Sequence, residues 1–432
     1  MRSSFEWQTI CRRGVESLQA VRPDGPGREG GGKRMLTYEE ARERILDRVS
    51  PLGVERVPLD AAAGRSLAGE VRAPGDLPPW DNSAMDGYAV RSADCRGEAV
   101  LAIAGYQTAG GPWADAVPPG GAVRIMTGSP IPRGCDAVVP FEEAEERDGS
   151  VRVSAPVRPR RHIRFKGEDV RAGERVIAEG TILRPPEISL LASFGRAMVP
   201  VYRKPRVAIL STGDELVELG EPPGHGKIVN SNSHAIAAAV VEAGGEPVLL
   251  GIARDEREDL RAKLSEGLAA DALVTSAGVS AGDRDLVRDV LGELGVENVF
   301  WKVLVKPGGP AAFGVAGRIP VFSLPGNPVS SLITFEVFVR PALRGMTGSP
   351  HPVKVPVKAA LAEPVKKKPG KTQFLRVRIE SGEGGYVART AGDQNTGILR
   401  TLVLADGIAV LPRERTDFAA GEKVDVLLLY VQ

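Results

Sequence analysis

Cysteine and histidine are scarce in this 432-residue sequence. Its three cysteines, Cys11, Cys95 and Cys135, are odd in number and show no metal-site spacing. They argue against a disulfide framework and a zinc ribbon, and they are typical of a protein kept in a reducing cytoplasm. The four histidines are scattered, so neither a histidine metal site nor a catalytic triad is indicated.

The sequence also lacks an excess of charge and long apolar runs. Lysine and arginine number 56 against 55 aspartates and glutamates, which leaves a net charge of +1. This balance argues against generic nucleic-acid binding. No apolar run approaches the ~18 residues that a membrane-spanning helix needs. An apolar share of 42% argues against disorder, and the 51 glycines and 34 prolines indicate many turns and short strands.

The first 34 residues differ from the rest of the chain. They contain no continuous apolar core, so they do not have the pattern of a secretory signal. Residues 23–32 are rich in glycine and proline, as in a flexible linker. We therefore expect residues 1–34 to be a disordered extension, or the product of a start codon assigned too far upstream.

Regular patterning begins near Met35. Thr37 and Glu40 form a capping-box pattern that predicts the start of a helix, and residues 54–59 follow as a short strand. Between residues 73 and 167, strand-like pieces alternate with Gly/Pro clusters, which indicates a small β module. Residues 185–193 then read as a helix with proline in its first turn.

From Arg206 onward, strands alternate with helices. Expected strands are 207–210, 246–252, 272–275, 298–305 and 319–324; expected helices are 234–243, 256–268, 283–294 and 328–343. This alternation predicts a parallel sheet covered on both faces. After His351 the β pattern returns, which predicts a second small β domain.

Three strand ends of this sheet carry loops of small and hydroxyl residues. They are Ser211–Glu215, Ser276–Asp283 and Leu324–Ser331. Ligands bind at the carboxyl ends of open parallel sheets, and small residues let backbone N–H groups approach an anion. One such loop alone is more often ordinary turn chemistry. Three on one edge favour a phosphate-binding rim, although no Walker or Gly-x-Gly-x-x-Gly motif is present.

Charged residues near these loops have two interpretations each. Lys302 and Lys306 are four apart, so on one strand they would share a face and suit an oxyanion, or simply form a solvated edge. Asp283, Asp285 and Asp289 follow the second loop. One of them could hold Mg²⁺ beside phosphates, whereas for Asp283 a helix-start role is favoured.

Two polar segments lie upstream of the sheet. Residues 78–89 mix acids, an amide, a serine and aromatics, which suits a binding loop or a packed turn. Residues 158–169 form a basic run that ends in two acids. That run is either a solvated loop or an arginine wall for a polyanion.

Several motifs in this order resemble the molybdopterin molybdenumtransferase (MoeA) family, which is similar to the E domain of gephyrin. The motifs are Asp81–Ala89, Arg124–Gly128, Lys166–Asp169, Ser211–Leu216, Ser276–Ser280 and Leu324–Pro328. The resemblance runs from about Met35 to Gln432.

The resemblance implies a multidomain α/β plus β protein with a doubly wound, MogA-like central domain. The implied domains are a discontinuous first domain (35–72 and 168–204), an inserted small β domain (73–167), a molybdopterin-binding α/β domain (205–346) and a C-terminal β-barrel-like domain (350–432). It further implies a homodimer with its active site at the subunit interface. Implied partners are a molybdopterin adenylyltransferase and the molybdoenzymes or their chaperones, with no nucleic acid and no membrane.

The implied reaction is the last step of molybdenum cofactor synthesis. Adenylylated molybdopterin and molybdate would give the cofactor and AMP, with Mg²⁺. Two alternatives stay open: adenylylation of molybdopterin by a MogA-like domain, and a gephyrin-like scaffold without turnover. ATP consumption without molybdate would favour the first alternative, and partner binding without AMP release the second.

Site residues carried over from the resemblance fall into three groups. Activity is implied for Asp86, Thr127, Asp169 and Glu187, and metal insertion for Asp285. Ligand-binding positions are Ser211, Thr212, Gly213, Ser276, Gly278, Lys302, Lys306, Pro325, Gly326, Asn327 and Pro328. Thr396 stands where the family often has serine. Two positions depart from the pattern: Asn230 replaces an acid of several members, and Gly309 replaces a lysine of some.

Overall fold

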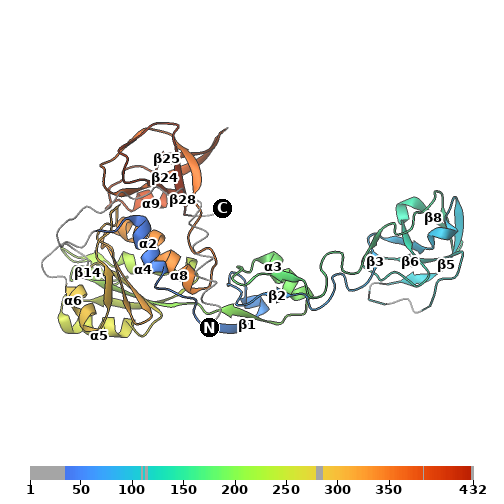
Figure 1. Cartoon of the computed structure of the whole chain (residues 1–432), viewed down its shortest axis with the longest axis horizontal. Helices are drawn as coiled ribbons and strands as arrows, with labels where there is room; N and C mark the ends of the chain where they lie inside the picture. Colours follow the sequence, from blue (N-terminus) through green and yellow to red (C-terminus); the bar gives the residue numbers. More distant parts are fainter. Residues whose placement is uncertain (1–34, 109, 112–114, 279–285, 383, 430–432) are drawn as a thin grey trace, which may run out of the picture. The chain divides into compact units, whose positions relative to one another are not determined.

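The computed structural model describes residues 35–108, 110–111, 115–278, 286–382 and 384–429 (Figure 1). The predicted extension, residues 1–34, lies outside the described residues. The described chain forms two compact units. The first comprises residues up to 68, 180–185 and from 198 onward, and the second comprises 69–179 and 186–197. The finer domain boundaries implied by the resemblance stay predictions.

Helix α2 (Tyr38–Leu46) opens the first unit with the predicted capping box. The Thr37 backbone N–H donates to Glu40 Oε2 at 2.9 Å, and the Glu40 N–H donates to Thr37 Oγ1 at 3.2 Å. These bonds satisfy two N–H groups that a helix start otherwise leaves unpaired. The ring of Tyr38 packs on Phe338 and edge-on against Phe374, with centroids 5.9 and 5.2 Å away.

The core of the first unit is a six-stranded sheet. Its order is β16 (Glu246–Ala253), β13 (Arg206–Thr212), β17 (Ala272–Ser276), β21 (Ile319–Leu324), β20 (Ala312–Ala316) and β18 (Glu297–Phe300). The first four strands are parallel, as predicted. At one edge, β20 runs antiparallel to both of its neighbours, β21 and β18. β20 was not predicted.

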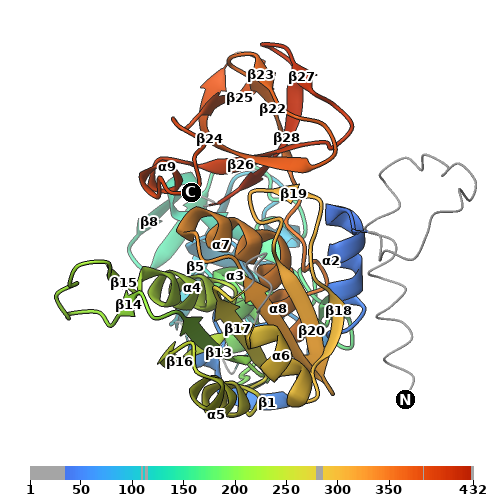
Figure 2. The same ribbon diagram turned by 90° about the vertical axis from the view of Figure 1, so that its left-hand side faces the viewer.

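Helices cover both faces of the sheet (Figure 2). Alternate residues along β13, β17 and β21 face opposite layers of helices. Ile209 and Val274 face α4 (Ser231–Glu242) and a long helix made of α7 (Pro328–Thr334), a π-helical turn (Phe335–Val339) and α8 (Arg340–Met346). Leu210 and Leu273 face α5 (Arg257–Gly267) and α6 (Leu286–Glu293). The predicted coverage of both faces is confirmed, because the period of two sends apolar side chains to each face.

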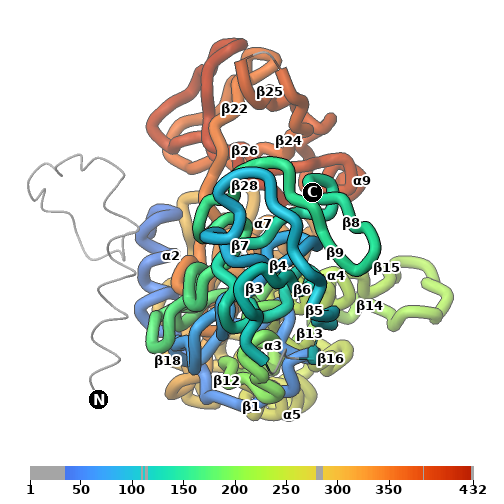
Figure 3. Tube along the Cα trace, turned by 90° about the vertical axis from the view of Figure 1, so that its right-hand side faces the viewer, coloured from blue at the N-terminus to red at the C-terminus, as the bar shows by residue number. Residues whose placement is uncertain are grey.

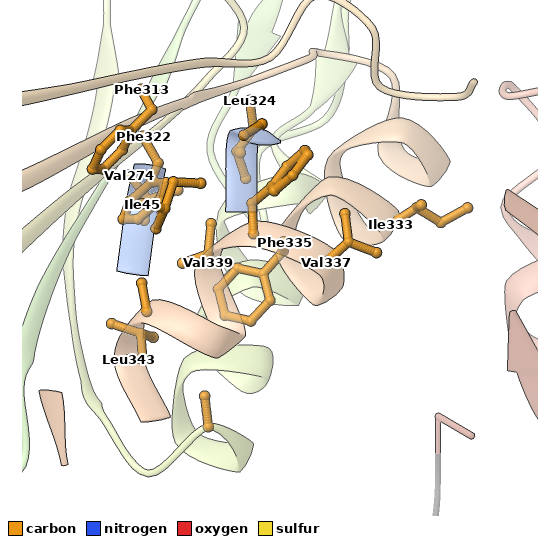
Figure 4. Close-up of a cluster of buried hydrophobic side chains, with 14 of the residues drawn as sticks. Ile45, Val274, Phe313, Phe322, Leu324, Ile333, Phe335, Val337, Val339 and Leu343 are labelled. Carbon is orange, nitrogen blue, oxygen red and sulfur yellow. The ribbon is translucent and has the colours of Figure 1, made fainter. Parts of the chain in front are cut away.

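Phenylalanine side chains pack among aliphatic ones in the layer between the sheet and the long helix (Figure 4). Phe322 is 1% exposed, and its ring centroid lies 5.0 Å from that of Phe313. We expect Phe322→Ala to lower the free energy of unfolding by about 3–5 kcal/mol, because the cavity cannot collapse fully. Urea unfolding followed by circular dichroism measures the loss. Leu249→Ala, at a side chain 47% exposed, is the control, and an equal loss there would contradict the expectation.

The C-terminal part of the first unit is a closed barrel. Its strands follow the order β24 (Thr372–Gly382), β25 (Gly385–Thr390), β22 (Val357–Leu361), β28 (Lys423–Leu428) and β26 (Gly407–Leu411), and β26 pairs back to β24. The two-residue strand β19 (Val305–Lys306) adds to β24 from outside. Shorter elements of the unit are β1 (Val54–Pro58) paired with β12 (Met198–Tyr202), β14 (Leu216–Val217) with β15 (Ile228–Val229), β23 (Val365–Lys366) with β27 (Asp417–Phe418), and α9 (Arg400–Val403).

The second unit contains the predicted small β module (Figure 3). Its sheet has the order β7 (Ala137–Pro140), β4 (Gly87–Val90), β6 (Gly121–Ile125), β5 (Ala99–Gln107), β9 (Ser150–Val153) and β8 (Ala144–Arg147). Two short ladders join β3 (Asn82–Ser83) to β10 (Ile163–Arg164) and β2 (Val71–Arg72) to β11 (Arg175–Ile177). Helix α3 (Pro185–Ser193) falls mostly in this unit and begins with two prolines, as predicted.

Candidate functional site

A cavity of about 460 Å³ lies at the carboxyl ends of β13, β17 and β21. It is lined by Ser211, Glu215, Leu216, Ile228, Val229, Asn230, Ser231, Asn232, Ser276, Ala277, Gly278, Pro310, Pro325, Gly326, Asn327 and Pro328. Seven predicted ligand-binding residues are in this lining: Ser211, Ser276, Gly278, Pro325, Gly326, Asn327 and Pro328. The three predicted loops therefore meet at one concave site.

Strand register explains why these loops meet. In the parallel ladders, Ser211 pairs with Ser276, and Ser276 pairs with Leu324, so the three strands end side by side. Thr212 and Gly213, which were also predicted to bind ligand, are buried at the end of β13 and outside the lining. The backbone then turns through Gly213 and Gly278, which have positive φ angles of 137° and 76°.

Helix α4 cross-links two of the loops. The Asn232 side-chain amide donates to Ser276 Oγ at 2.8 Å and to the Gly326 carbonyl at 2.7 Å. Its first turn also contributes Asn230 and Ser231 to the lining. The sequence pattern predicted that this helix begins at His234, and the places of Ser231 and Asn232 in the site were not predicted, although an asparagine N-cap before an apolar helical pattern is a recognised start signal.

The barrel supplies a further contact at the rim. Asn327 Nδ2 lies 3.5 Å from Thr396 Oγ1. The loop that carries Thr396 is held by Arg376, a fully buried side chain that donates to the carbonyls of Asp393 at 2.9 Å and Asn395 at 3.2 Å. Burial lowers the pKa of the Arg376 guanidinium. The Thr396 loop of the barrel thus lies beside Asn327 at one edge of the candidate site.

The two predicted lysines do not share a strand. Residues 301–304 lie between β18 and β19, so the same-face argument for Lys302 and Lys306 was wrong. Both side chains are exposed, and neither belongs to the described lining of the cavity. The chain leaves the central sheet after Phe300, and β19 pairs instead with the barrel strand β24. A ligand-binding role for the lysines stays a prediction.

A lysine side chain lies close to Gly309, the position at which some family members have a lysine. A Cβ placed on Gly309 would be 3.8 Å from Lys371 Nζ and 3.2 Å from the Val305 carbonyl. Lys371 therefore brings positive charge to the loop that carries Pro310 into the cavity lining.

The described residues supply one carboxylate to this lining, that of Glu215. Asp285, the predicted metal residue, lies outside the described residues. In the described part of the chain, no three His, Cys, Asp or Glu side chains gather into a metal-binding group. One carboxylate with amide and hydroxyl oxygens fits the way Mg²⁺ binds when substrate phosphates complete its shell.

In the second unit, two predicted activity residues touch each other. Asp86 precedes β4 and Thr127 follows β6, and the pairing of Gly87 with Ile125 brings them together. The Thr127 backbone N–H and hydroxyl both donate to Asp86 Oδ1 at 2.7 Å. The backbone bond first, and then the hydroxyl, lower the pKa of Asp86 from 3.8, so the exposed carboxylate is ionised at neutral pH.

Asp169 and Glu187 occupy other segments of the same unit. The Asp169 N–H donates to the Leu77 carbonyl at 3.1 Å, and the Lys166 N–H donates to Asp81 Oδ1 at 2.8 Å. These bonds place the Lys166–Asp169 turn against the polar segment 78–89. Glu187 is half-buried in the first turn of α3. An activity role for these residues stays a prediction.

Family models match three successive parts of the chain. Residues 36–195 match the MoeA N-terminal region (domain I and II), residues 208–345 a probable molybdopterin binding domain, and residues 358–429 the MoeA C-terminal region (domain IV). The sequence is 38% identical to the molybdopterin molybdenumtransferase of Haemophilus influenzae over 91% of this chain and 98% of that protein. This chain belongs to the MoeA family.

Further comparisons agree with this membership. The molybdopterin molybdenumtransferase 2 of Mycobacterium tuberculosis is 39% identical over 91% of this chain and 99% of its own length. The crystal structure of the molybdopterin biosynthesis moeA protein from Pyrococcus horikoshii matches with a TM-score of 0.80 and 32% identity, covering 91% of this chain and all of that one. The resemblance and fold class predicted from the sequence are confirmed. Within the described residues, no helix is long and apolar enough to cross a membrane.

Proposed function

We propose that this MoeA-family chain is a transferase that inserts molybdenum into molybdopterin in molybdenum cofactor biosynthesis. In finer detail, we propose that the substrates are adenylylated molybdopterin and molybdate, and that AMP leaves. The observation that carries the proposal is the cavity where three strand-end loops of a molybdopterin-binding domain converge. We also propose a cytoplasmic homodimer with its active site at the subunit interface, working beside a molybdopterin adenylyltransferase and molybdoenzymes or their chaperones.

The lining is suited to binding an anionic ligand through hydrogen-bond donors and positive charge rather than to attacking it with a nucleophilic side chain. Small residues such as Ser276 and Gly278 let backbone N–H groups approach, and the N-terminus of α4 adds a favourable dipole. Lys371, and the predicted ligands Lys302 and Lys306, would offset phosphate charge. Mg²⁺, when bound, supplies charge neutralisation as the phosphoanhydride opens. Glu215 and Asp285 are the carboxylates that we propose to hold it.

We propose that acidic residues of the second unit take part in the reaction by hydrogen bonding or by proton transfer. Asp86 stays ionised because Thr127 donates two hydrogen bonds to it, so Asp86 acts as an acceptor rather than an acid. Asp169 and Glu187 are proposed to contribute to the same activity.

The test is AMP release by the purified full-length chain from adenylylated molybdopterin, molybdate and Mg²⁺. We expect AMP and active cofactor in equal amounts, and loss of both when the metal is chelated or Asp285 is replaced by alanine. Asp289→Ala, at an exposed acid in α6, is the matched control and should keep the rate. No AMP release, ATP consumption without molybdate, or binding without turnover would contradict the proposal.

A further inference from the structure

Arg376 is a buried arginine of the barrel whose guanidinium is held by main-chain oxygens. It lies in β24 and is 0% exposed. Its Nη2 donates to the carbonyls of Asp393 at 2.9 Å and Asn395 at 3.2 Å, and among the described residues its Nε has no hydrogen-bond partner. Burying a charged side chain costs free energy, and an apolar side chain of similar length would fill the same space without that cost. The charged group therefore has a use other than packing.

The main chain of Arg376 anchors the same loop. Strand β25 pairs with β24 as far as Thr390, and the chain then leaves the sheet. The Ala391 N–H donates to the Arg376 carbonyl at 2.9 Å. The Gln394 side chain takes the place of a neighbouring strand, because its Oε1 accepts from the Arg376 N–H at 3.0 Å and its Nε2 donates to the Arg376 carbonyl at 3.3 Å. One residue thus holds the loop 391–395 by its main chain and its side chain together.

The loop that Arg376 holds carries Thr396 to the rim of the cavity. Two tight turns shape it, since the Asn395 N–H donates to Asp393 Oδ1 at 2.9 Å and the Gly397 N–H donates to Asn395 Oδ1 at 3.0 Å. Thr396 Oγ1 lies 3.5 Å from Nδ2 of Asn327, which belongs to the cavity lining. A shift of this loop would therefore move a hydroxyl group at the edge of the site.

We propose that Arg376 is a positioning residue of this site, which acts on the bound pterin nucleotide through the Thr396 hydroxyl. Arg376 is buried in the barrel and does not touch the ligand itself. Thr396 Oγ1 accepts from Asn327, so its own proton stays available to an oxygen of the ligand. Holding the loop in place before binding lowers the entropy cost of ordering it. The inference deepens the proposed function and rests on it for the identity of the ligand.

A small set of substitutions isolates this role. Arg376→Met keeps the length of the side chain and removes both bonds to the loop carbonyls, whereas Arg376→Lys keeps the charge and a single donor group. Arg378→Met, at an exposed arginine of the same strand, is the matched control. Thr396→Val removes the hydroxyl and keeps the shape of the side chain. Gln394→Ala releases the loop without removing the buried charge, and it carries the test if Arg376→Met does not fold.

Affinity for adenylylated molybdopterin is measured by isothermal titration calorimetry on the full-length chain without molybdate, so that no cofactor forms. We expect Arg376→Met and Thr396→Val each to weaken binding about tenfold, as the loss of one hydrogen bond to a charged group does. Arg376→Lys should lose less, and Arg378→Met should bind as the wild type does. In the Thr396→Val background, Arg376→Met should cause no further loss, because both changes act through the same hydroxyl.

Two further measurements separate positioning from a purely structural role. Hydrogen exchange of residues 391–397 should be faster in Arg376→Met than in the wild type, and unchanged in Arg378→Met. A purely structural role would lower the melting temperature of Arg376→Met, leave the affinity of the folded protein unchanged, or add to the loss that Thr396→Val causes. Unchanged affinity, additive losses, or unaltered exchange of the loop would each overturn the inference.

The same experiment distinguishes this inference from the proposed function. A wild-type chain that binds adenylylated molybdopterin through Arg376 and Thr396 but forms no cofactor would overturn the function and leave the inference in place. A chain that forms cofactor, with Arg376 variants that bind as the wild type does, would do the reverse. No binding of adenylylated molybdopterin by the wild type would overturn both.

Discussion

Asp86→Ala is expected to lower the rate of cofactor formation by about 10²–10⁴-fold, the range that a positioned acid or base contributes. Thr127 makes both its bonds to Asp86 Oδ1, so in the described part of the chain Oδ2 is available to a ligand. The substitution removes this carboxylate and also releases the Thr127 loop. Single-turnover AMP release measures the effect.

Asp86→Asn separates these two losses. The asparagine oxygen can accept both bonds from Thr127, whereas the negative charge is gone. If Asp86 acts through its charge, Asp86→Asn should be nearly as slow as Asp86→Ala. Near wild-type activity in Asp86→Asn would mean that Asp86 only anchors the Thr127 loop. Because the carboxylate pKa is lowered, Asp86 should not contribute a step in rate between pH 5 and 8.

Gly278→Val is expected to abolish ligand binding and to slow AMP release by at least ~100-fold, since a shift of about 1 Å in a positioning loop costs this much. Gly278 has a φ of 76°, where a β-branched residue is strained. An added Cβ would lie 2.4 Å from Val287 Cγ2 and 3.3 Å from Thr212 Oγ1, so the loop would have to move. Binding of AMP and the rate of AMP release measure the change.

Ala277→Gly is the matched control for this loop. Ala277 also has a φ of 76°, a strained value for a residue with a side chain. Glycine at this position relieves strain without filling space, so ligand binding should be retained. If Ala277→Gly lost as much activity as Gly278→Val, loop flexibility rather than the shape of the cavity would explain both results.

The candidate cavity could be predicted from sequence because its determinants are local. Apolar strands such as Val207–Leu210 each end in a small-residue loop, and parallel strands bring their ends to one edge. The capping box at Thr37 could be predicted for the same reason, because both of its hydrogen bonds join residues that are three apart in the sequence. Predictions of this kind depend on few long-range contacts.

Other features depend on distant partners and could not be predicted in this way. Residues 298–305 read as one strand, yet Phe300 pairs with Phe313 in the central sheet and Val305 with Thr372 in the barrel. Neither partner is visible in the local pattern. The hydrogen bonds that Asn230 Oδ1 accepts from Ser211 Oγ and the Ser233 N–H likewise depend on the positions of these residues in the folded chain.

The pairing of β19 with β24 bears on where the polypeptide can be cut. Lys306 pairs with Gln373, and the next residue, Phe374, packs against Tyr38 of helix α2. A fragment ending near residue 350 would leave β19 and Tyr38 without these neighbours, and the excised barrel would present Phe374 to water. During synthesis, β19 and Tyr38 can therefore complete these contacts only after residues 372–374 have been made.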